Sequence, residues 1–300
     1  MNILQTGEIW AFVEGLAAVK QNDKWGFINR EGRFAIQPQF HDVFGFSEGL
    51  AAVKKDKKYG YIDKNGTFVI APRFDWAMPF SDGVASVTLD SSTLIIDKQG
   101  NTLFAMSDEN AEVNNFSEGL AVVDIDLKSG YLNHEGKMVI EPQFDYASPF
   151  VDGIALVNVG EKWGFINTQG EYVLPLQYDE AENFSEGVAP VCKEGQWRFV
   201  DLHGDTVANL GSQYTTVFSL IEGRAIVEKD GKFGAIDKAG NLIIDTRFDH
   251  LGTFSEGLAY ARMGQTQGFV TPSGTFDIQR PIPNRSLMDR LLGRKKFLEW

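Results

Sequence analysis

Short apolar runs separated by polar turns follow one another along the chain, and residues 49–80 show this pattern clearly. The alternation predicts four strands, at 49–55, 59–63, 67–71 and 74–80. Between the second and third strands, Asn65-Gly66 favours a tight type I′ turn, because both residues tolerate a positive φ. Pro72 is expected to end the third strand, since proline has no N–H group for a sheet. The pattern predicts an all-β protein.

A six-residue marker, Phe-Ser-Glu-Gly-(Leu/Val)-Ala, gives this pattern its period. Complete copies begin at Phe46, Phe116, Phe184 and Phe254. Copies with conservative substitutions begin at Phe12, Phe80 and Phe150, and the copy at Phe218 carries an insertion. The intervals between these phenylalanines are 34, 34, 36, 34, 34, 34 and 36 residues. Such regular spacing identifies a repeat protein. We therefore predict eight tandem β-meander repeats of about 34 residues, within a single domain at residues 1–280.

Two features are kept in every repeat. One is a glycine in a predicted hairpin turn, whose predecessor varies: Gly32, Gly66, Gly100, Gly136, Gly170, Gly204, Gly240 and Gly274. This indicates that the backbone geometry is what the repeat requires. The other is the acid of the marker: Glu14, Glu48, Asp82, Glu118, Asp152, Glu186, Glu222 and Glu256. We interpret these acids as turn carboxylates that accept local backbone N–H groups, with a ladder of ligand-binding acids as the alternative.

The motif Lys-Trp-Gly-Phe-Ile-Asn stands at residues 24–29 and again at 162–167, and related forms stand at 59–63, 129–133 and 233–237. A Pro-(Gln/Arg)-Phe-Asp element occurs downstream, at 72–75 and 142–145. These residues resemble the WG-repeat, or KWG-repeat, family of bacterial proteins, over residues 10 to 280. The resemblance implies a binding or interaction scaffold with no common enzymatic activity, and it does not fix a ligand.

Repeats three and six depart from this pattern. Thr93-Leu94 and Trp197-Arg198 replace the Trp-Gly pair, and neither repeat has the Pro-Gln-Phe element. The eighth repeat has Gln267-Gly268 at the same place. We expect specificity to lie where the copies disagree, in repeats three and six and in the C-terminal tail.

One repeat has an apolar face that is too small to bury alone, so neighbouring repeats must stack. Two arrangements compete: a β-propeller with one radial sheet per repeat, and an open β array that grows with copy number. A repeat of about 34 residues is short for a propeller blade. Eight copies can nevertheless close and so remove exposed edges, which favours the propeller. The aromatic residue of the Trp-Gly position is expected to pack between adjacent repeats.

The composition restricts the class of partner. The chain has 41 acidic and 28 basic side chains, for a net charge of −13, so a nucleic acid would be repelled. A basic protein fits this charge. The single cysteine, Cys192, cannot form an intrachain disulfide, and we expect it to be buried and inert. We see no signal peptide and no apolar span long enough for a bilayer, so a cytoplasmic location is expected.

The sequence contains no cluster of residues that suggests catalysis or metal binding. The four histidines lie in different repeats, and no His-x-x-x-His or Cys-x-x-Cys spacing occurs. The carboxylates recur with the repeat, whereas a catalytic pair should be local and singular. We therefore expect no enzymatic activity, no metal and no cofactor.

Residues 281–300 form a basic amphipathic tail that differs from the repeats. Ser286 can cap a helix, and apolar residues recur at helical spacing after it, so a short C-terminal helix is predicted. One interpretation is that this helix docks on the acidic body of the protein itself. The other is that it anchors a partner or a membrane surface, without spanning a membrane, through Leu287, Leu291, Leu292, Phe297 and Trp300.

The leading functional hypothesis is a non-catalytic scaffold for protein–protein binding. A specific form of it is the neutralisation of a basic partner such as a toxin, as an immunity protein would do. The alternative is a carbohydrate or small-ligand binding module that uses aromatic residues such as Trp10, Trp76 and Tyr146. The sequence leaves the oligomeric state open.

Overall fold

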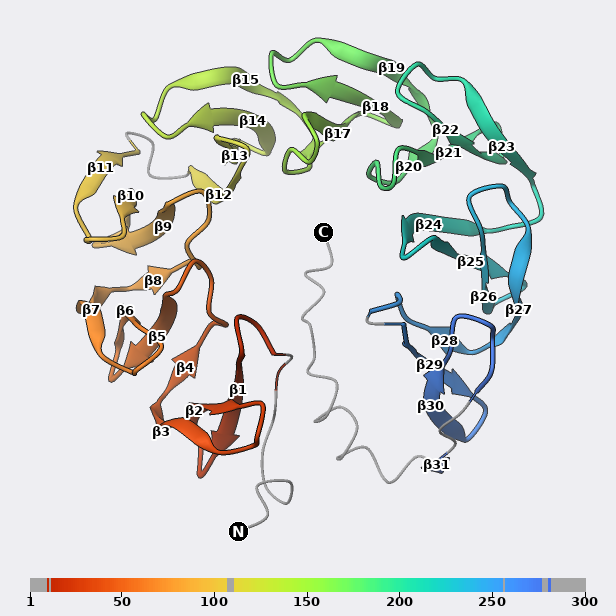
Figure 1. Ribbon diagram of the computed structural model, residues 1–300. Coiled ribbons are helices and arrows are strands. Elements are labelled where there is room, and N and C mark those ends of the chain that lie inside the picture. The colour runs from red at the N-terminus through yellow and green to blue at the C-terminus, as the bar shows by residue number, and fades with distance from the viewer. Residues whose placement is uncertain (1–9, 11, 107–110, 256, 277–279, 282–300) are drawn as a thin grey trace. The chain divides into compact units, whose positions relative to one another are not determined.

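The computed structural model describes residues 10, 12–106, 111–255, 257–276 and 280–281. All regular elements in these residues are β-strands, which form eight small antiparallel sheets (Figure 1). The all-β, tandem-repeat prediction is therefore confirmed. The chain divides into two compact units, unit 1 up to Pro142 and unit 2 over Gln143–Ile282. The helix predicted within 281–300 falls on residues of which only Pro281, at the end of a strand, is described.

Within each sheet, the strands pair in the order in which they follow one another along the chain, so every sheet is a meander. In unit 1 the strands are β1 (Leu16–Gln21), β2 (Lys24–Asn29) and β3 (Phe34–Phe40); β4 (Asp42–Val43), β5 (Ala51–Lys55), β6 (Lys58–Ile62) and β7 (Phe68–Phe74); β8 (Trp76–Ala77), β9 (Val84–Leu89), β10 (Ser92–Asp97) and β11 (Thr102–Ala105); and β12 (Glu112–Ser117), β13 (Leu120–Ile125), β14 (Lys128–Asn133) and β15 (Met138–Phe144).

Unit 2 repeats the same arrangement. Its strands are β16 (Tyr146–Ala147), β17 (Ile154–Val159), β18 (Lys162–Asn167) and β19 (Tyr172–Tyr178); β20 (Glu180–Ala181), β21 (Ala189–Lys193), β22 (Gln196–Val200) and β23 (Thr206–Gly211); β24 (Thr216–Ile221), β25 (Arg224–Lys229), β26 (Lys232–Ile236) and β27 (Leu242–Phe248); and β28 (His250–Leu251), β29 (Ala259–Met263), β30 (Thr266–Val270) and β31 (Arg280–Pro281).

The fourth strand expected at 74–80 is shorter than predicted and belongs to a different sheet. Only Trp76 and Ala77 form a strand there, β8, and it pairs with β9 rather than with the strands before it. The marker that begins at Phe80 therefore connects the first and second strands of one sheet. Each repeat consequently supplies the last three strands of its own sheet and the first strand of the next.

Pro72 does not end the third strand, contrary to the prediction. β7 continues through it to Phe74 as the outermost strand of its sheet. Tyr59 pairs with Phe74, and Tyr61 pairs with Ile70. Between these two pairs, β7 contains two more residues than β6, which makes a bulge in β7. Pro72 lies in that bulge. A missing N–H group is tolerated there, because edge strands and bulges leave donors unpaired.

The predicted type I′ turn at Asn65-Gly66 is also wrong. Only Gly66 has a positive φ, of 82°, and Asp63 and Thr67 pair around a three-residue loop, with the Asp63 N–H bonded to the Thr67 carbonyl at 2.9 Å. This geometry is typical of a type I turn followed by a glycine bulge. The Asp63 carboxylate accepts the N–H groups of Asn65 and Thr67, each at 2.9 Å, which rigidifies the loop.

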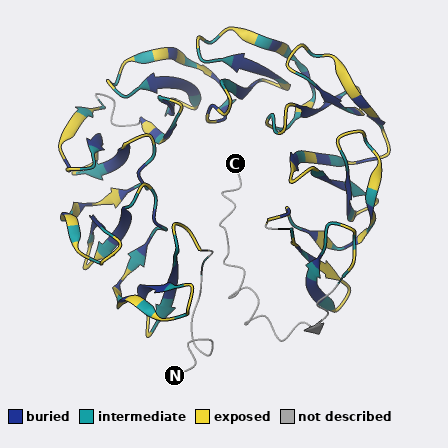
Figure 2. Cartoon of the chain, in the orientation of Figure 1, coloured by how far each residue is buried: buried dark blue, intermediate teal, exposed yellow. Residues whose placement is uncertain are grey.

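The core lies between neighbouring sheets. One cluster joins Tyr61 and Phe74 of the β4–β7 sheet to Val87 and Ile96 of the next sheet, and all four side chains are buried. Figure 2 shows the burial concentrated in the middle strands, with exposure in the turns and outermost strands. The expectation that single repeats cannot bury their apolar faces alone agrees with this packing.

The marker of repeat seven begins at Leu220 and not at Phe218. Leu220 is fully buried whereas Phe218 is 37% exposed. Leu220 also pairs with Ala225 as Phe116 pairs with Ala121. The insertion therefore precedes the marker, and the corrected intervals are 34, 34, 36, 34, 34, 36 and 34 residues.

This correction reveals a longer period. Both 36-residue intervals fall in the repeats that lack the glycine of the Trp-Gly position, three and six, so the pattern of two regular repeats and one irregular repeat recurs every 104 residues. The extra residues lengthen the first strand of the following sheet. β12 and β24 have six residues each, whereas β4, β8, β16, β20 and β28 have two.

Candidate functional site

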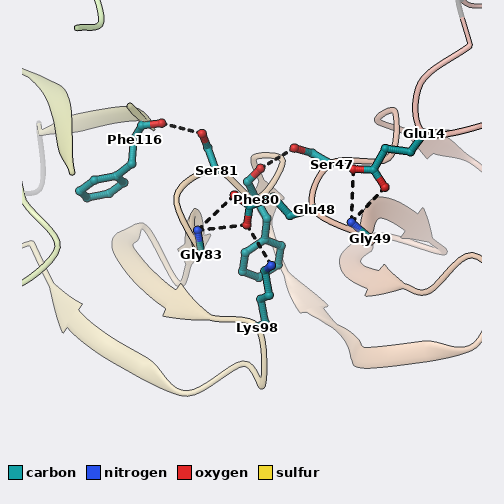
Figure 3. Close-up of polar contacts among 9 residues, drawn as sticks. All are labelled: Glu14, Ser47, Glu48, Gly49, Phe80, Ser81, Gly83, Lys98 and Phe116. Atoms are coloured by element: carbon teal, nitrogen blue, oxygen red, sulfur yellow. Dashed lines mark hydrogen bonds and ion pairs between the residues drawn. The ribbon is translucent and has the colours of Figure 1, made fainter. Parts of the chain in front are cut away.

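The acids of five markers bind the next repeat, and this corrects the expectation of a local turn contact. The Glu48 carboxylate accepts the N–H of Gly83, 35 residues further on, at 3.0 Å, and Lys98 lies 3.0 Å from the same oxygen (Figure 3). Further pairs of this kind are Glu14 with Gly49, Asp82 with Gly119, Glu186 with Gly223, and Glu222 with Gly257.

The conformation of these acids supports an inter-repeat role. Glu48 has a φ of 53° and Gly49 a φ of 84°, and the flanking Ser47 and Leu50 exchange both backbone hydrogen bonds, at 2.8 and 3.1 Å. The marker is therefore the two-residue hairpin that needs positive φ at both positions. Glutamate is not favoured at a positive φ. Its recurrence at this position is therefore explained by the contact that its carboxylate makes with the next repeat.

The serine of the marker adds a second contact to the following marker. The Ser47 hydroxyl donates to the carbonyl of Phe80 at 2.7 Å, and the Ser81 hydroxyl donates to the carbonyl of Phe116 at 2.6 Å (Figure 3). The residues that the copies share are therefore used to join one repeat to the next. A binding function must rest on positions where the copies differ.

Such positions form a row across each sheet. In the β4–β7 sheet, Asp42 lies opposite Lys54, and Lys54 lies opposite Tyr59, so their side chains are on the same face. The corresponding rows are Trp76–Thr88–Thr93, Glu112–Asp124–Ser129, Tyr146–Asn158–Trp163, Glu180–Cys192–Trp197, Thr216–Glu228–Phe233 and His250–Arg262–Gln267. We call them the cross-strand rows. Every row has a different chemistry.

In unit 1 two neighbouring rows contribute to a compact surface that we call the aromatic–lysine patch, formed by Phe44, Lys54, Tyr59, Trp76 and Met78. The Trp76 ring lies 5.3 Å from Tyr59 and 5.6 Å from Phe44, both edge-on. The ammonium group of Lys54 lies 5.0 Å from the Tyr59 ring centre, and the indole N–H of Trp76 points to the Met78 sulfur at 3.4 Å. The patch therefore joins two neighbouring sheets.

The exposure of the patch is uneven. Tyr59 is buried, and its hydroxyl donates to the Asp42 carboxylate at 2.6 Å. Burial and this hydrogen bond raise the pKa of Tyr59 far above its usual value, so it stays neutral. Trp76 is 45% exposed. A rigid aromatic ring that is held on one side and open on the other is typical of an interface anchor.

In unit 2 the rows combine aromatic and acidic side chains. The Tyr146 and Trp163 rings lie 5.5 Å apart. Burial, and secondly the charge of Glu180, raise the pKa of the Glu182 carboxyl. Cys192 is buried, as expected, and burial is the main reason that the pKa of its thiol is raised. A thiol in this state is a poor nucleophile.

Of the predicted binding residues, the structure describes the aromatic residues of the repeats but not the residues of the C-terminal tail. Leu287, Leu291, Leu292, Phe297 and Trp300 lie outside the described residues. The aromatics of the carbohydrate hypothesis each pack on the ring at the Trp-Gly position of a repeat: Trp10 on Trp25, Trp76 on Tyr59, and Tyr146 on Trp163. Tyr59 and Trp76 belong to the same repeat but to adjacent sheets, so the ring at the Trp-Gly position of repeat two packs between sheets.

Phe44, Lys54 and Met78 were missed by the sequence reasoning, although an alignment of the eight repeats marks their positions as variable. Within the residues that the structure describes, no group of three or more His, Cys, Asp or Glu side chains could hold a metal ion. No helix long and apolar enough to cross a membrane is found in the same residues.

Comparisons with known proteins agree with the repeat pattern. The family model of the WG-containing repeat matches residues 7–25, 25–59, 59–91, 130–163, 163–197, 197–233 and 233–266. The stretch between residues 91 and 130, which contains the irregular part of repeat three, is not matched. No curated protein matches the chain.

Two solved structures illustrate the likeness of the fold. The crystal structure of a eukaryotic initiation factor is 8% identical, with 89% of this chain and 85% of that chain covered and a TM-score of 0.62. Hsv2 of Kluyveromyces lactis is 8% identical, with 92% of this chain and 99% of that chain covered and a TM-score of 0.45. The second value is too low to carry an argument.

Proposed function

Since this chain belongs to the family of WG-containing repeat proteins, we propose that it is a non-catalytic scaffold that binds a protein partner through the aromatic–lysine patch. One observation carries the proposal. The shared residues are occupied in joining repeats, whereas Phe44, Trp76 and Met78 form an apolar, partly open surface at variable positions. Aromatic residues and methionine are enriched at the centres of protein interfaces.

The net negative charge of residues 76–276 supports a basic partner. Residues 76–276 carry twelve lysine and arginine side chains against twenty-nine acids, whereas residues 10–75 carry ten against eight. The excess of acid is therefore concentrated after the second repeat. An acidic field of this kind accelerates association with a basic protein and is weakened by salt. We propose neutralisation of a basic partner as the specific form of this function.

The first test removes the exposed rings. The double variant Phe44→Ala, Trp76→Ala should lower the affinity for a co-purified partner at least about ten-fold, because interface aromatics are common hot spots. The control is Leu103→Ala, which truncates an equally exposed apolar side chain of unit 1 outside the patch. Affinity purification from the source cells, followed by titration of the recovered protein, measures both. Equal affinity of the two variants would refute the patch as the binding surface.

The carbohydrate alternative has less support, because Trp10, Trp76 and Tyr146 each face a different ring of the protein. A glycan array separates the two functions. Glycan binding that disappears with Trp76→Ala would favour the carbohydrate module over the protein-binding scaffold.

We also propose that the eight sheets are the blades of a closed β-propeller. The repeated four-stranded meander and the contacts between successive markers support this arrangement. Small-angle X-ray scattering tests it: a closed ring should give a compact pair-distance distribution, and an open array should give a long tail at large distances. The tail would refute closure.

A further inference from the structure

The hairpin between β5 and β6 differs in charge from the equivalent hairpins. Its residues Lys55, Asp56, Lys57 and Lys58, together with Pro72 of the β7 bulge, line an open depression of about 520 Å³. We call it the lysine depression. Lys55 lies directly opposite Lys58, and Lys55 and Lys57 are exposed. The first two repeats have more basic than acidic side chains, so this concentration of lysine is not cancelled by its surroundings.

Only one of the three lysines has a structural explanation. Lys58 forms an ion pair with Asp75 at 2.5 Å, and the equivalent lysines of repeats five and seven form the same pair, Lys162 with Asp179 and Lys232 with Asp249. The Lys55 ammonium group lies 5.7 Å from the centre of the Phe68 ring. Among the described residues, no ion pair or side-chain hydrogen bond of Lys55 or Lys57 is found. The fold itself does not require these two charges.

Repeat five shows what the hairpin needs structurally. Its residues Val159, Gly160 and Glu161 occupy the places of Lys55, Asp56 and Lys57. In both hairpins the first turn residue has a positive φ, 56° for Asp56 and 61° for Gly160, and the second does not. The backbone therefore accepts valine and glutamate where repeat two has lysines. Two unpaired ammonium groups in an exposed depression indicate an anionic ligand.

We propose that the lysine depression binds an acidic polypeptide segment, on a surface separate from the aromatic–lysine patch. Asp56 stands between Lys55 and Lys57, and Asp75 stands beside Lys58. These carboxylates repel the dense phosphates of a nucleic acid, as does the acidic remainder of the chain. A peptide strand can space its carboxylates about 7 Å apart along one side, and an apolar side chain of the peptide can contact Pro72, which lines the depression.

The test uses the full chain and a fluorescein-labelled decapeptide of eight glutamates with two central leucines. Fluorescence anisotropy at low salt should show binding. The double variant Lys55→Val, Lys57→Glu, which carries the residues of repeat five, should weaken it about five-fold or more. Asp56→Gly should strengthen it about two-fold, because it removes a like charge and places the glycine of repeat five at the same φ.

Two controls separate this site from others. Phe44→Ala with Trp76→Ala should leave the affinity for the acidic decapeptide unchanged, so that failure of this proposal and failure of the proposed function are distinguishable. The same decapeptide with lysine in place of glutamate should not bind to the depression. Three results would overturn the proposal: no binding by the wild type, equal affinity of the Lys55→Val, Lys57→Glu variant, or equal affinity for a ten-residue oligothymidine.

Discussion

Gly60→Ala should lower the free energy of unfolding by about 3 kcal/mol or more, or prevent folding. A Cβ atom on Gly60 would lie 2.5 Å from the Ile70 carbonyl oxygen, 2.7 Å from the Pro72 nitrogen and 2.9 Å from the Ala71 carbonyl carbon. All three are backbone atoms of the β7 bulge, so no side-chain rotation can relieve the contact. Denaturant unfolding, followed by tryptophan fluorescence, measures the loss.

Repeat six supplies the matched control for this prediction. Arg198 stands where six of the other seven copies have the glycine, and it pairs with Asn209 of a strand that has no proline at this point. Arg198→Ala should therefore change the free energy of unfolding by less than about 1 kcal/mol. If Gly60→Ala were as mild as Arg198→Ala, the close approach of the β7 bulge to β6 would be wrong.

Ser47→Ala combined with Glu48→Ala should lower the free energy of unfolding by about 2 kcal/mol. The change removes the hydroxyl that donates to the Phe80 carbonyl and the carboxylate that accepts the Gly83 N–H. Net values of about 1 kcal/mol for a neutral hydrogen bond and somewhat more for a charged one give this magnitude. The lost contacts join two repeats, so calorimetry should also show a broader transition.

The conservative variant Glu48→Gln separates the hydrogen bond from the ion pair. Glutamine keeps an acceptor for the Gly83 N–H but loses the charge that faces Lys98, at 3.0 Å. Because that pair is partly exposed, its loss should cost less than about 1 kcal/mol. A loss with Glu48→Gln as large as with the double alanine variant would contradict the role of the backbone hydrogen bonds.

The repeat register, the turn glycines and the all-β class were accessible from the sequence because each depends on local residue types. The interpretation of Pro72 failed because the bulge that accommodates proline is set by β6, which approaches through Gly60. The interpretation of the marker acids failed for a similar reason. Glu48 looks like a turn residue locally, and its partner lies 35 residues away.

The candidate site was harder to predict. Trp76 was recognised as a possible contact residue, but the sequence assigned it to the strand set of its own repeat, whereas β8 belongs to the next sheet. Its neighbours Phe44 and Tyr59 belong to the preceding sheet, so only the packing of sheets shows that they meet Trp76. Phe218 has the residue type of the marker's first position, but the buried Leu220 occupies that position in the fold.

The same two irregular repeats also define the unit in which this molecule is built. In repeats three and six, Leu94 and Arg198 replace the glycine and pair with Ala105 and Asn209. The glycine of five other repeats instead faces a bulge whose backbone a Cβ atom would strike. A duplication of 104 residues preserves the spacing of the irregular repeats, whereas a duplication of repeat three or six alone would place two irregular repeats side by side, a junction that the chain does not contain. The true period of the chain is thus a set of three repeats.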